Sequence, residues 1–247
     1  GIRDTPTVSA FLLNRSSDLA GVVDEAARET LFDDAGLTPR EREIALMLAE
    51  HGMTVYAGVR KTEDGDELTE AAVGILKPVR LDVTSGADIE RTLKTIADDG
   101  GLGALVNNAG VYIGGPLELM RDEDIDATFQ VNVLGLLRLT RACLPMLRQS
   151  RGRIVNISSI SGLVALPGVS VYAGSKHAVE AITDSLRVEL SPFGVTVIAV
   201  EPGSIQTEIW RKDRESDNPW LDTAYGPIFK NRDKVIEKSE QSALPVE

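Results

Sequence analysis

Short, almost continuously apolar runs alternate with longer amphipathic stretches through most of the chain. Such runs are typical of strands that helices cover on both faces. The predicted strands are residues 54–59, 78–81, 104–107, 153–158 and 195–200. The predicted helices between them are residues 87–98, 122–149 and 174–191. This alternation implies βαβ crossovers, so the pattern predicts an α/β fold built on a parallel sheet.

The first 42 residues follow a different pattern. Apolar positions at helical spacing predict an amphipathic helix over residues 17–32. A second helix begins with Thr38 as its N-cap and Glu41 three positions later, which is a capping box, and it ends at Gly52. We therefore predict an atypical N-terminal segment, residues 1–42, ahead of a single domain, residues 43–247.

Composition narrows the classes of function. The 247 residues suffice for one large α/β domain, and the net charge of −12 disfavours nucleic acid and anionic membranes as partners. The single cysteine, Cys143, excludes an internal disulfide and lies in an apolar stretch, so we expect a buried thiol. No apolar run is long enough to span a membrane, and no signal peptide or metal site is evident. These features predict a cytoplasmic protein.

The candidate chemistry lies in a Tyr-x-x-x-Lys run. Tyr172 and Lys176 are four residues apart and therefore share one face of a helix. There the lysine ammonium is expected to lower the tyrosine pKa from its unperturbed value of about 10, giving a proton donor and acceptor near neutral pH. Ser159 lies upstream, and an Asn-Asn-Ala-Gly run occupies residues 107–110.

Together with further motifs, this site resembles the classical short-chain dehydrogenase/reductase family from about residue 42 to residue 207. The further motifs are Leu-Asp-Val at 81–83, Asn132 within Val-Asn-Val-Leu-Gly, and Pro-Gly-Ser-Ile-Gln-Thr at 202–207. The resemblance implies a Rossmann-like, doubly wound parallel sheet flanked by helices. The first strand and the C-terminal edge strand are the two that these motifs do not identify.

The resemblance also implies a role for each catalytic residue. Tyr172 would exchange a proton with the substrate oxygen, and Ser159 would hold that oxygen by a hydrogen bond. Lys176 would bind the nicotinamide ribose, and Asn132 would support a water that links Lys176 to solvent. The cofactor contacts implied by the family are Asp82, Val83, Asn108, Ala109, Gly110, Tyr172, Lys176, Pro202, Gly203, Ile205 and Thr207.

Arg60 bears on the choice of cofactor. It ends the second predicted strand, where an acidic residue would accept a hydrogen bond from the adenosine ribose and an arginine would suit a 2′-phosphate. No acid occupies residues 57–60. We therefore expect NADP(H) in preference to NAD(H), which is kept as the alternative.

The glycine-rich turn of the family is absent from its expected place. Counting back by the family spacing leads to residues 34–41, where Ala35, Pro39 and Glu41 fill the three glycine positions. Glycine is needed there because the backbone must turn sharply and approach the phosphates closely. Residues 28–33 stand where the first strand is expected, in competition with the helix prediction.

Three hypotheses follow for the function. The first is an oxidoreductase that transfers hydride between NADP(H) and an apolar alcohol or ketone, such as a steroid, retinoid or lipid-like carbonyl. Residues 163–167 and Trp210 would surround that substrate, although core packing explains the same apolar residues. The second is a non-catalytic relative that serves as a binding or scaffold protein because the phosphate-binding loop is absent.

The third hypothesis is a DNA-binding element, because residues 37–43 resemble the opening of a helix-turn-helix from quorum-sensing regulators. No recognition helix follows, and the acidic charge disfavours it. The apolar faces of residues 122–149 and 174–191 resemble surfaces that pair family members into homodimers or homotetramers, although burial within one subunit explains much of the same pattern.

Overall fold

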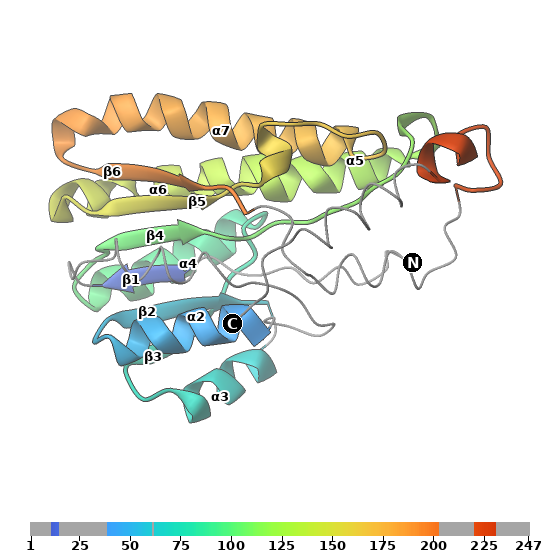
Figure 1. The fold of residues 1–247 in the computed structure, drawn as a ribbon. Helices are drawn as coiled ribbons and strands as arrows, with labels where there is room; N and C mark the ends of the chain where they lie inside the picture. Colours follow the sequence, from blue (N-terminus) through green and yellow to red (C-terminus); the bar gives the residue numbers. More distant parts are fainter. Residues whose placement is uncertain (1–10, 15–38, 61, 203–219, 231–247) are drawn as a thin grey trace.

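The computed structural model describes residues 11–14, 39–60, 62–202 and 220–230, which build a six-stranded sheet in the order β3-β2-β1-β4-β5-β6 (Figure 1). The strands are β1 (Phe11–Asn14), β2 (Thr54–Val59), β3 (Leu76–Arg80), β4 (Ala104–Asn107), β5 (Arg153–Ile157) and β6 (Thr196–Val200). The helices are α2 (Pro39–Glu50), α3 (Thr62–Ala71), α4 (Gly86–Asp98), α5 (Asp122–Phe129), α6 (Leu136–Ser150) and α7 (Ser170–Leu190). Shorter helical turns are η1 (Leu117–Leu119), η2 (Gln130–Gly135), η3 (Ile160–Gly162) and η4 (Ser191–Phe193).

The α/β class and the strands predicted from residue 54 onward are confirmed. The predicted helix over residues 122–149 is present but divided, because the π-helical turn η2 separates α5 from α6. The helix α3 was not predicted; Gly65 interrupts its pattern. Within the described ranges, no helix is long and apolar enough to cross a membrane.

The central strand β1 differs from the prediction in its direction. It pairs antiparallel with both neighbours, so that Phe11 lies opposite Ala57 of β2 and Val106 of β4. The pairs β2–β3, β4–β5 and β5–β6 are parallel. The predicted parallel pairing is therefore confirmed for the other strands, whereas the first strand, which the motifs did not identify, runs in the opposite direction. An antiparallel ladder also satisfies the backbone groups that β2 and β4 present to it. The helix predicted over residues 17–32 and the strand considered at 28–33 lie outside the described residues.

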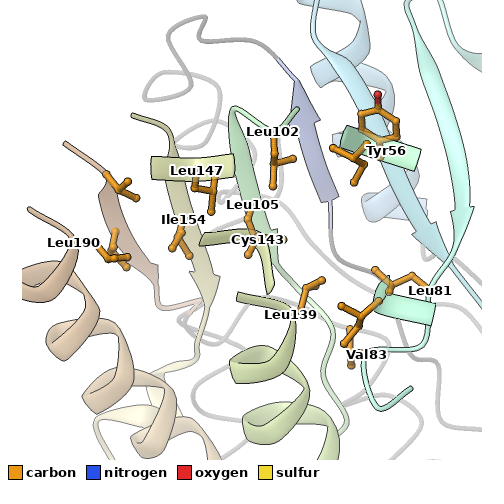
Figure 2. Packing of buried hydrophobic residues seen from close by; sticks show 14 residues of the cluster. Tyr56, Leu81, Val83, Leu102, Leu105, Leu139, Cys143, Leu147, Ile154 and Leu190 are labelled. Carbon is orange, nitrogen blue, oxygen red and sulfur yellow. The ribbon is translucent and has the colours of Figure 1, made fainter. Parts of the chain in front are cut away.

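Two apolar layers cover the two faces of the sheet. On one face, α4, α6 and α7 pack on the strands, and Figure 2 shows Leu139 and Cys143 beside Leu105 and Ile154. On the other face, α2 and α3 cover β2, β4 and β5. Cys143 is buried as predicted, and burial raises its pKa to about 12, so this thiol acts as a packing group.

The end of α2 confirms the stop predicted at Gly52. Gly52 has a φ of +82°, which a side chain rarely adopts. Its N–H donates to the Ala49 carbonyl at 3.0 Å, and the Met53 N–H donates to the Leu48 carbonyl at 3.2 Å. This pair of bonds is a Schellman motif, and it turns the chain directly into β2. The predicted capping side chains at the start of α2 lie outside the described side chains.

Candidate active site

The carboxyl ends of the parallel strands gather the predicted catalytic residues. The turn of residues 108–110 follows β4, and Ser159 follows β5. Tyr172 and Lys176 lie in the first turns of α7, which packs along β6 and η3. Ligands bind at this edge in open α/β sheets, so the sequence motifs and the fold indicate the same site.

Burial and the Ser159 side chain act in opposite directions on the Tyr172 phenol. Burial raises the pKa of Tyr172, and the hydrogen bond with Ser159 offsets part of that rise. The Ser159 Oγ also accepts a hydrogen bond from the Ser161 N–H at 3.1 Å, which fixes the hydroxyl at the start of η3. At neutral pH the Tyr172 phenol therefore keeps its proton and can donate it.

Lys176 is almost entirely buried, with 6% of its surface exposed. Its ammonium donates to the Ile157 carbonyl at 2.9 Å. Burial lowers the pKa of Lys176 to about 8, and the Glu180 carboxylate acts in the opposite direction. The group therefore titrates close to neutral pH, where a proton relay is most useful.

The prediction that Lys176 lowers the pKa of Tyr172 is wrong. The Lys176 Nζ lies 5.8 Å from the centre of the Tyr172 ring and is bonded to the Ile157 carbonyl. The loss of hydration around the buried phenol outweighs the Ser159 hydrogen bond, so the Tyr172 pKa moves upward. Sequence spacing gave the correct face of the helix but not the extent of burial.

Asn132 joins the turn after β4 to the helices. It lies in the π-helical turn η2, and such turns often mark functional sites. Its Oδ1 accepts from the Val111 N–H at 2.8 Å, and its Nδ2 donates to the Val111 carbonyl at 2.9 Å. The same Nδ2 donates to the Ser175 Oγ at 3.0 Å. Asn132 therefore fixes the turn of residues 108–110 against the start of α7.

A buried polar ladder holds the strand ends below the site. The Asn107 Nδ2 donates to the Asn156 Oδ1 at 2.8 Å and to the Thr140 Oγ1 at 2.9 Å. The Asn156 Nδ2 donates to the Thr183 Oγ1, also at 2.8 Å. These bonds connect β4, β5, α6 and α7. Buried hydrogen bonds of this kind are costly to break, so the ladder holds the strand ends in place.

At the predicted adenine end, Asp82, Val83 and Arg60 all follow β2 or β3. The Asp82 carboxylate accepts from the Thr84 N–H and hydroxyl at 2.8 and 2.7 Å, so one of its oxygens caps a turn. The Val83 side chain is buried in the core and packs closely against Gly135, since a Cβ added at Gly135 would lie 2.7 Å from it. Only the backbone of Val83 is therefore left for a ligand, while Arg60 is exposed at the end of β2.

The segment after β6 reaches the same edge. Pro202 is partly buried, and its carbonyl accepts from the Ile160 N–H at 3.0 Å, which joins it to η3. The predicted cofactor residues Gly203, Ile205 and Thr207 lie outside the described residues.

Sequence reasoning missed an aromatic residue beside the catalytic phenol. Tyr112 stands edge-on to Tyr172, with ring centres 5.0 Å apart and planes at 75°. Such T-shaped pairs are favourable, and this one narrows the orientations open to the Tyr172 ring. Its place two residues after the Asn-Asn-Ala-Gly run was a local signal that could have identified it.

Residues 220–230 pack against the loops that follow β4 and precede α7. Phe229 is buried against Gly168, and a Cβ added at Gly168 would lie 2.8 Å from its ring. Trp220 lies against Gly115, and a Cβ added there would lie 3.1 Å from the indole ring. The Gly115 N–H donates to the Gly168 carbonyl at 2.8 Å. Bare glycines are required at these two contacts because any side chain would push the aromatic rings away.

The apolar side chains between η3 and α7 are exposed. Leu163, Val164 and Leu166 project from the core rather than into it. The packing explanation considered for these residues is therefore wrong, and they form an apolar surface near Ser159.

The family resemblance implies a dinucleotide, and the structure describes the two ends of the edge to different extents. If residue 110 had a side chain, its Cβ would lie 3.5 Å from the Asn132 Oδ1 and 3.7 Å from the Lys176 Nζ. Because residue 110 is glycine, only its backbone lies next to the Lys176 ammonium on this side. At β1, the reversed strand brings Phe11 to the carboxyl edge. The nicotinamide end therefore fits. At the diphosphate end the described residues offer the reversed β1, and residues 15–38, which connect it to α2, lie outside the described residues.

Comparisons with known proteins agree with this geometry. Residues 41–218 match the model of the family described as short chain dehydrogenase. The chain is 38% identical over 204 residues to the NADPH-dependent 3-dehydrocapnine reductase of Ornithobacterium rhinotracheale, covering 79% of this chain and 72% of that protein. It is 37% identical over 212 residues to human retinol dehydrogenase 16, covering 80% and 67%. The crystal structure of a gluconate 5-dehydrogenase from Burkholderia cenocepacia in complex with NADP and tartrate is similar with a TM-score of 0.64, at 25% identity over 72% of each chain.

Proposed function

The chain belongs to the short-chain dehydrogenase/reductase family and is an oxidoreductase, and from that premise we propose that it transfers hydride between NADP(H) and an apolar alcohol or ketone. The observation that carries the proposal is the cluster of Ser159, Tyr172 and Lys176 at the carboxyl edge. A partly buried phenol, a hydroxyl that acts on it and a lysine of pKa about 8 form a proton-transfer unit.

In the direction of reduction, Tyr172 donates its proton to the substrate oxygen while Ser159 holds that oxygen by a hydrogen bond. The raised pKa of Tyr172 suits this direction, because the phenol is protonated at neutral pH. Lys176, with its pKa of about 8, is charged below that pH, and its ammonium would bind the nicotinamide ribose. When bound, the nicotinamide supplies the hydride.

The residues that would hold the nicotinamide end are Lys176 and the turn of residues 108–110, which Asn132 fixes. At the adenine end we assign Arg60 to a 2′-phosphate, since a guanidinium binds phosphate well and the residue is exposed. Support for NADP(H) over NAD(H) comes from a relative named as NADPH-dependent and from the similar structure that contains NADP.

An apolar substrate suits the walls of the site. Leu163, Val164 and Leu166 offer exposed aliphatic surface, and Tyr112 and Trp220 add aromatic rings. One of the similar proteins is named for retinol, which is a long apolar alcohol. Steroids, retinoids and lipid-like ketones are therefore the substrates to test first.

We also propose that the protein forms a homodimer or homotetramer. The exposed apolar side chains Phe129, Leu134, Leu137 and Val188 lie on α5, η2, α6 and α7. Exposed large apolar side chains on helix surfaces are typical of subunit interfaces.

Titration with NADPH tests the proposal. Cofactor fluorescence is expected to saturate, and a panel of apolar ketones is then expected to give substrate-dependent NADPH consumption. NADH at the same concentration is the control for the role of Arg60, together with the variant Arg60→Ala, which is expected to weaken NADPH binding more than NADH binding.

The reversed β1 favours a second candidate, a non-catalytic binding protein. In that case NADPH would produce neither a saturable fluorescence change nor a rise in melting temperature, although the protein would be folded. Either cofactor response would exclude this candidate.

A further inference from the structure

Two buried polar atoms behind the catalytic lysine have no hydrogen-bond partner among the described residues: the Ser158 Oγ and the Glu180 Oε1. Ser158 is 3% exposed. Buried polar atoms normally form hydrogen bonds with protein groups or with an internal water, so two such atoms without a partner require an explanation.

Gly162 packs against both of these side chains. A Cβ on this glycine would lie 2.8 Å from the Ser158 Oγ, 3.1 Å from the Glu180 Cγ and 3.1 Å from the Lys176 carbonyl. The absence of a side chain at Gly162 therefore lets η3 approach α7 closely. The contact lies one helical turn beyond Lys176, because Glu180 follows it by four residues.

The charge pattern of the chain makes this carboxylate distinctive. The sequence contains no Asp or Glu from residue 127 to residue 179, a stretch that includes η2, α6, β5 and η3. The elements around the Lys176 ammonium present Tyr172, Asn132 and the Ile157 carbonyl, none of which is an anion at neutral pH. Within the described structure, Glu180 is the carboxylate whose field acts on this ammonium.

We propose that Glu180 is a positioning residue that keeps the buried Lys176 in its charged form, from a helix face that packs closely against Ser158 and Gly162. A buried ammonium loses hydration and tends to release its proton, and a nearby carboxylate counteracts that tendency. Glu180 need not touch substrate or cofactor to do this. The consequence for turnover rests on the proposed function, whereas the effect on the lysine proton does not.

The variant Glu180→Gln tests this directly, since it removes the charge at nearly constant shape. Lys176 is observed by NMR of protein labelled at its lysine side chains, with the signal assigned from Lys176→Arg. In the unaltered protein the titration midpoint is expected near pH 8. In Glu180→Gln it is expected to fall by about one unit, a tenfold loss of proton affinity.

Glu189→Gln is the matched control, because Glu189 is exposed on the same helix and is not part of the site. It is expected to leave the Lys176 midpoint unchanged, and Glu180→Asp, which retains the charge, is expected to recover part of the shift. An identical midpoint in Glu180→Gln and the unaltered protein would overturn the proposal.

If Glu180→Gln does not fold, the double variant Glu180→Gln/Lys176→Met decides the question. Removing the ammonium along with its counter-charge is expected to restore folding, because the uncompensated buried charge is gone. A double variant that also fails to fold would show that Glu180 is a packing residue, against the proposal.

The NMR readout requires neither cofactor nor substrate, so the two proposals can fail separately. A shifted midpoint in a protein without NADPH turnover would support the role of Glu180 and refute the proposed function. Where turnover is present, the alkaline loss of activity is expected to move to lower pH by the same amount as the midpoint.

Discussion

The half of the sheet from β4 to β6 and the half around β1 are held together in different ways. In the first, side chains bond across elements: Asn107 to Asn156, Asn156 to Thr183 and Asn132 to Val111 are all buried contacts of 2.8 Å. In the second, β1 is joined to its neighbours by a backbone ladder only four residues long, in the direction opposite to theirs.

The difference shows that the catalytic geometry does not depend on how the central position of the sheet is filled. Ser159, Tyr172, Lys176 and Asn132 all come from elements after β4. Backbone hydrogen bonds between strands can form with either strand direction, whereas a network of buried side chains requires one arrangement of its elements. The catalytic half can therefore form its site although Ala35, Pro39 and Glu41 fill the glycine positions of the family in the other half of the chain.

The largest expected effect comes from placing proline in each half. Val155→Pro in β5 removes a ladder hydrogen bond between two parallel neighbours and is expected to prevent folding. Leu12→Pro in β1 is expected to cost about 1–3 kcal/mol, the penalty of a lost ladder hydrogen bond, and leave a folded protein. Urea denaturation followed by circular dichroism measures both. Equal effects would contradict the difference between the halves.

Tyr172→Phe is expected to reduce turnover about 10³-fold, because it removes the proton donor and little else. The melting temperature is expected to change little, since the ring and its contact with Tyr112 are retained. NADPH consumption with an apolar ketone is the measurement. Activity within tenfold of the unaltered enzyme would show that another group supplies the proton.

Lys176 is expected to make stability depend on pH in the catalytic half. Its folded-state pKa of about 8 lies below its ordinary value of 10.5, so the unfolded chain binds more protons between these limits. Stability is therefore expected to rise with pH across this window, by roughly 3 kcal/mol.

The variant Lys176→Met is the control for that prediction, because it keeps every other titrating group, including Cys143. The difference in unfolding free energy between the two proteins, measured from about pH 8 to 10.5, isolates the lysine. Parallel curves would mean that Lys176 is not desolvated in the folded protein.

The smallest effect is expected at two helix ends, one in each half. Gly52→Ala and Gly194→Ala both force a side chain into positive φ, at +82° and +70°, and each is expected to cost about 1 kcal/mol. Amide hydrogen-exchange rates then show whether each substitution affects only its own half of the sheet. Gly52→Ala is expected to speed exchange in α2 and β2 but not in α7, and a uniform increase would indicate a single cooperative unit.

Periodicity alone predicted the strands from β2 to β6 and the principal helices, because burial on both faces leaves continuous apolar runs such as residues 104–107. The stop at Gly52 was also readable, since positive φ favours glycine there. The strand β1 was not identified. Its four residues carry little pattern, and backbone pairing places no constraint on direction.

For the candidate site, the order and spacing of Ser159, Tyr172 and Lys176 were enough to name the cluster that the structure brings together. The upward shift of the Tyr172 pKa, the position of Tyr112 and the unpaired oxygen of Glu180 were not readable. Each depends on how much water the surrounding elements exclude, which is a property of packing between distant segments.

The sequence by itself determined the α/β class, the family and the chemical groups of the site, because these follow from local periodicity and short motifs. Only the tertiary structure decided the direction of β1, the protonation preferences of Tyr172 and Lys176, and the proximity of Glu180 to Ser158. The physical reason is that strand pairing and desolvation are set by contacts between residues far apart in the chain.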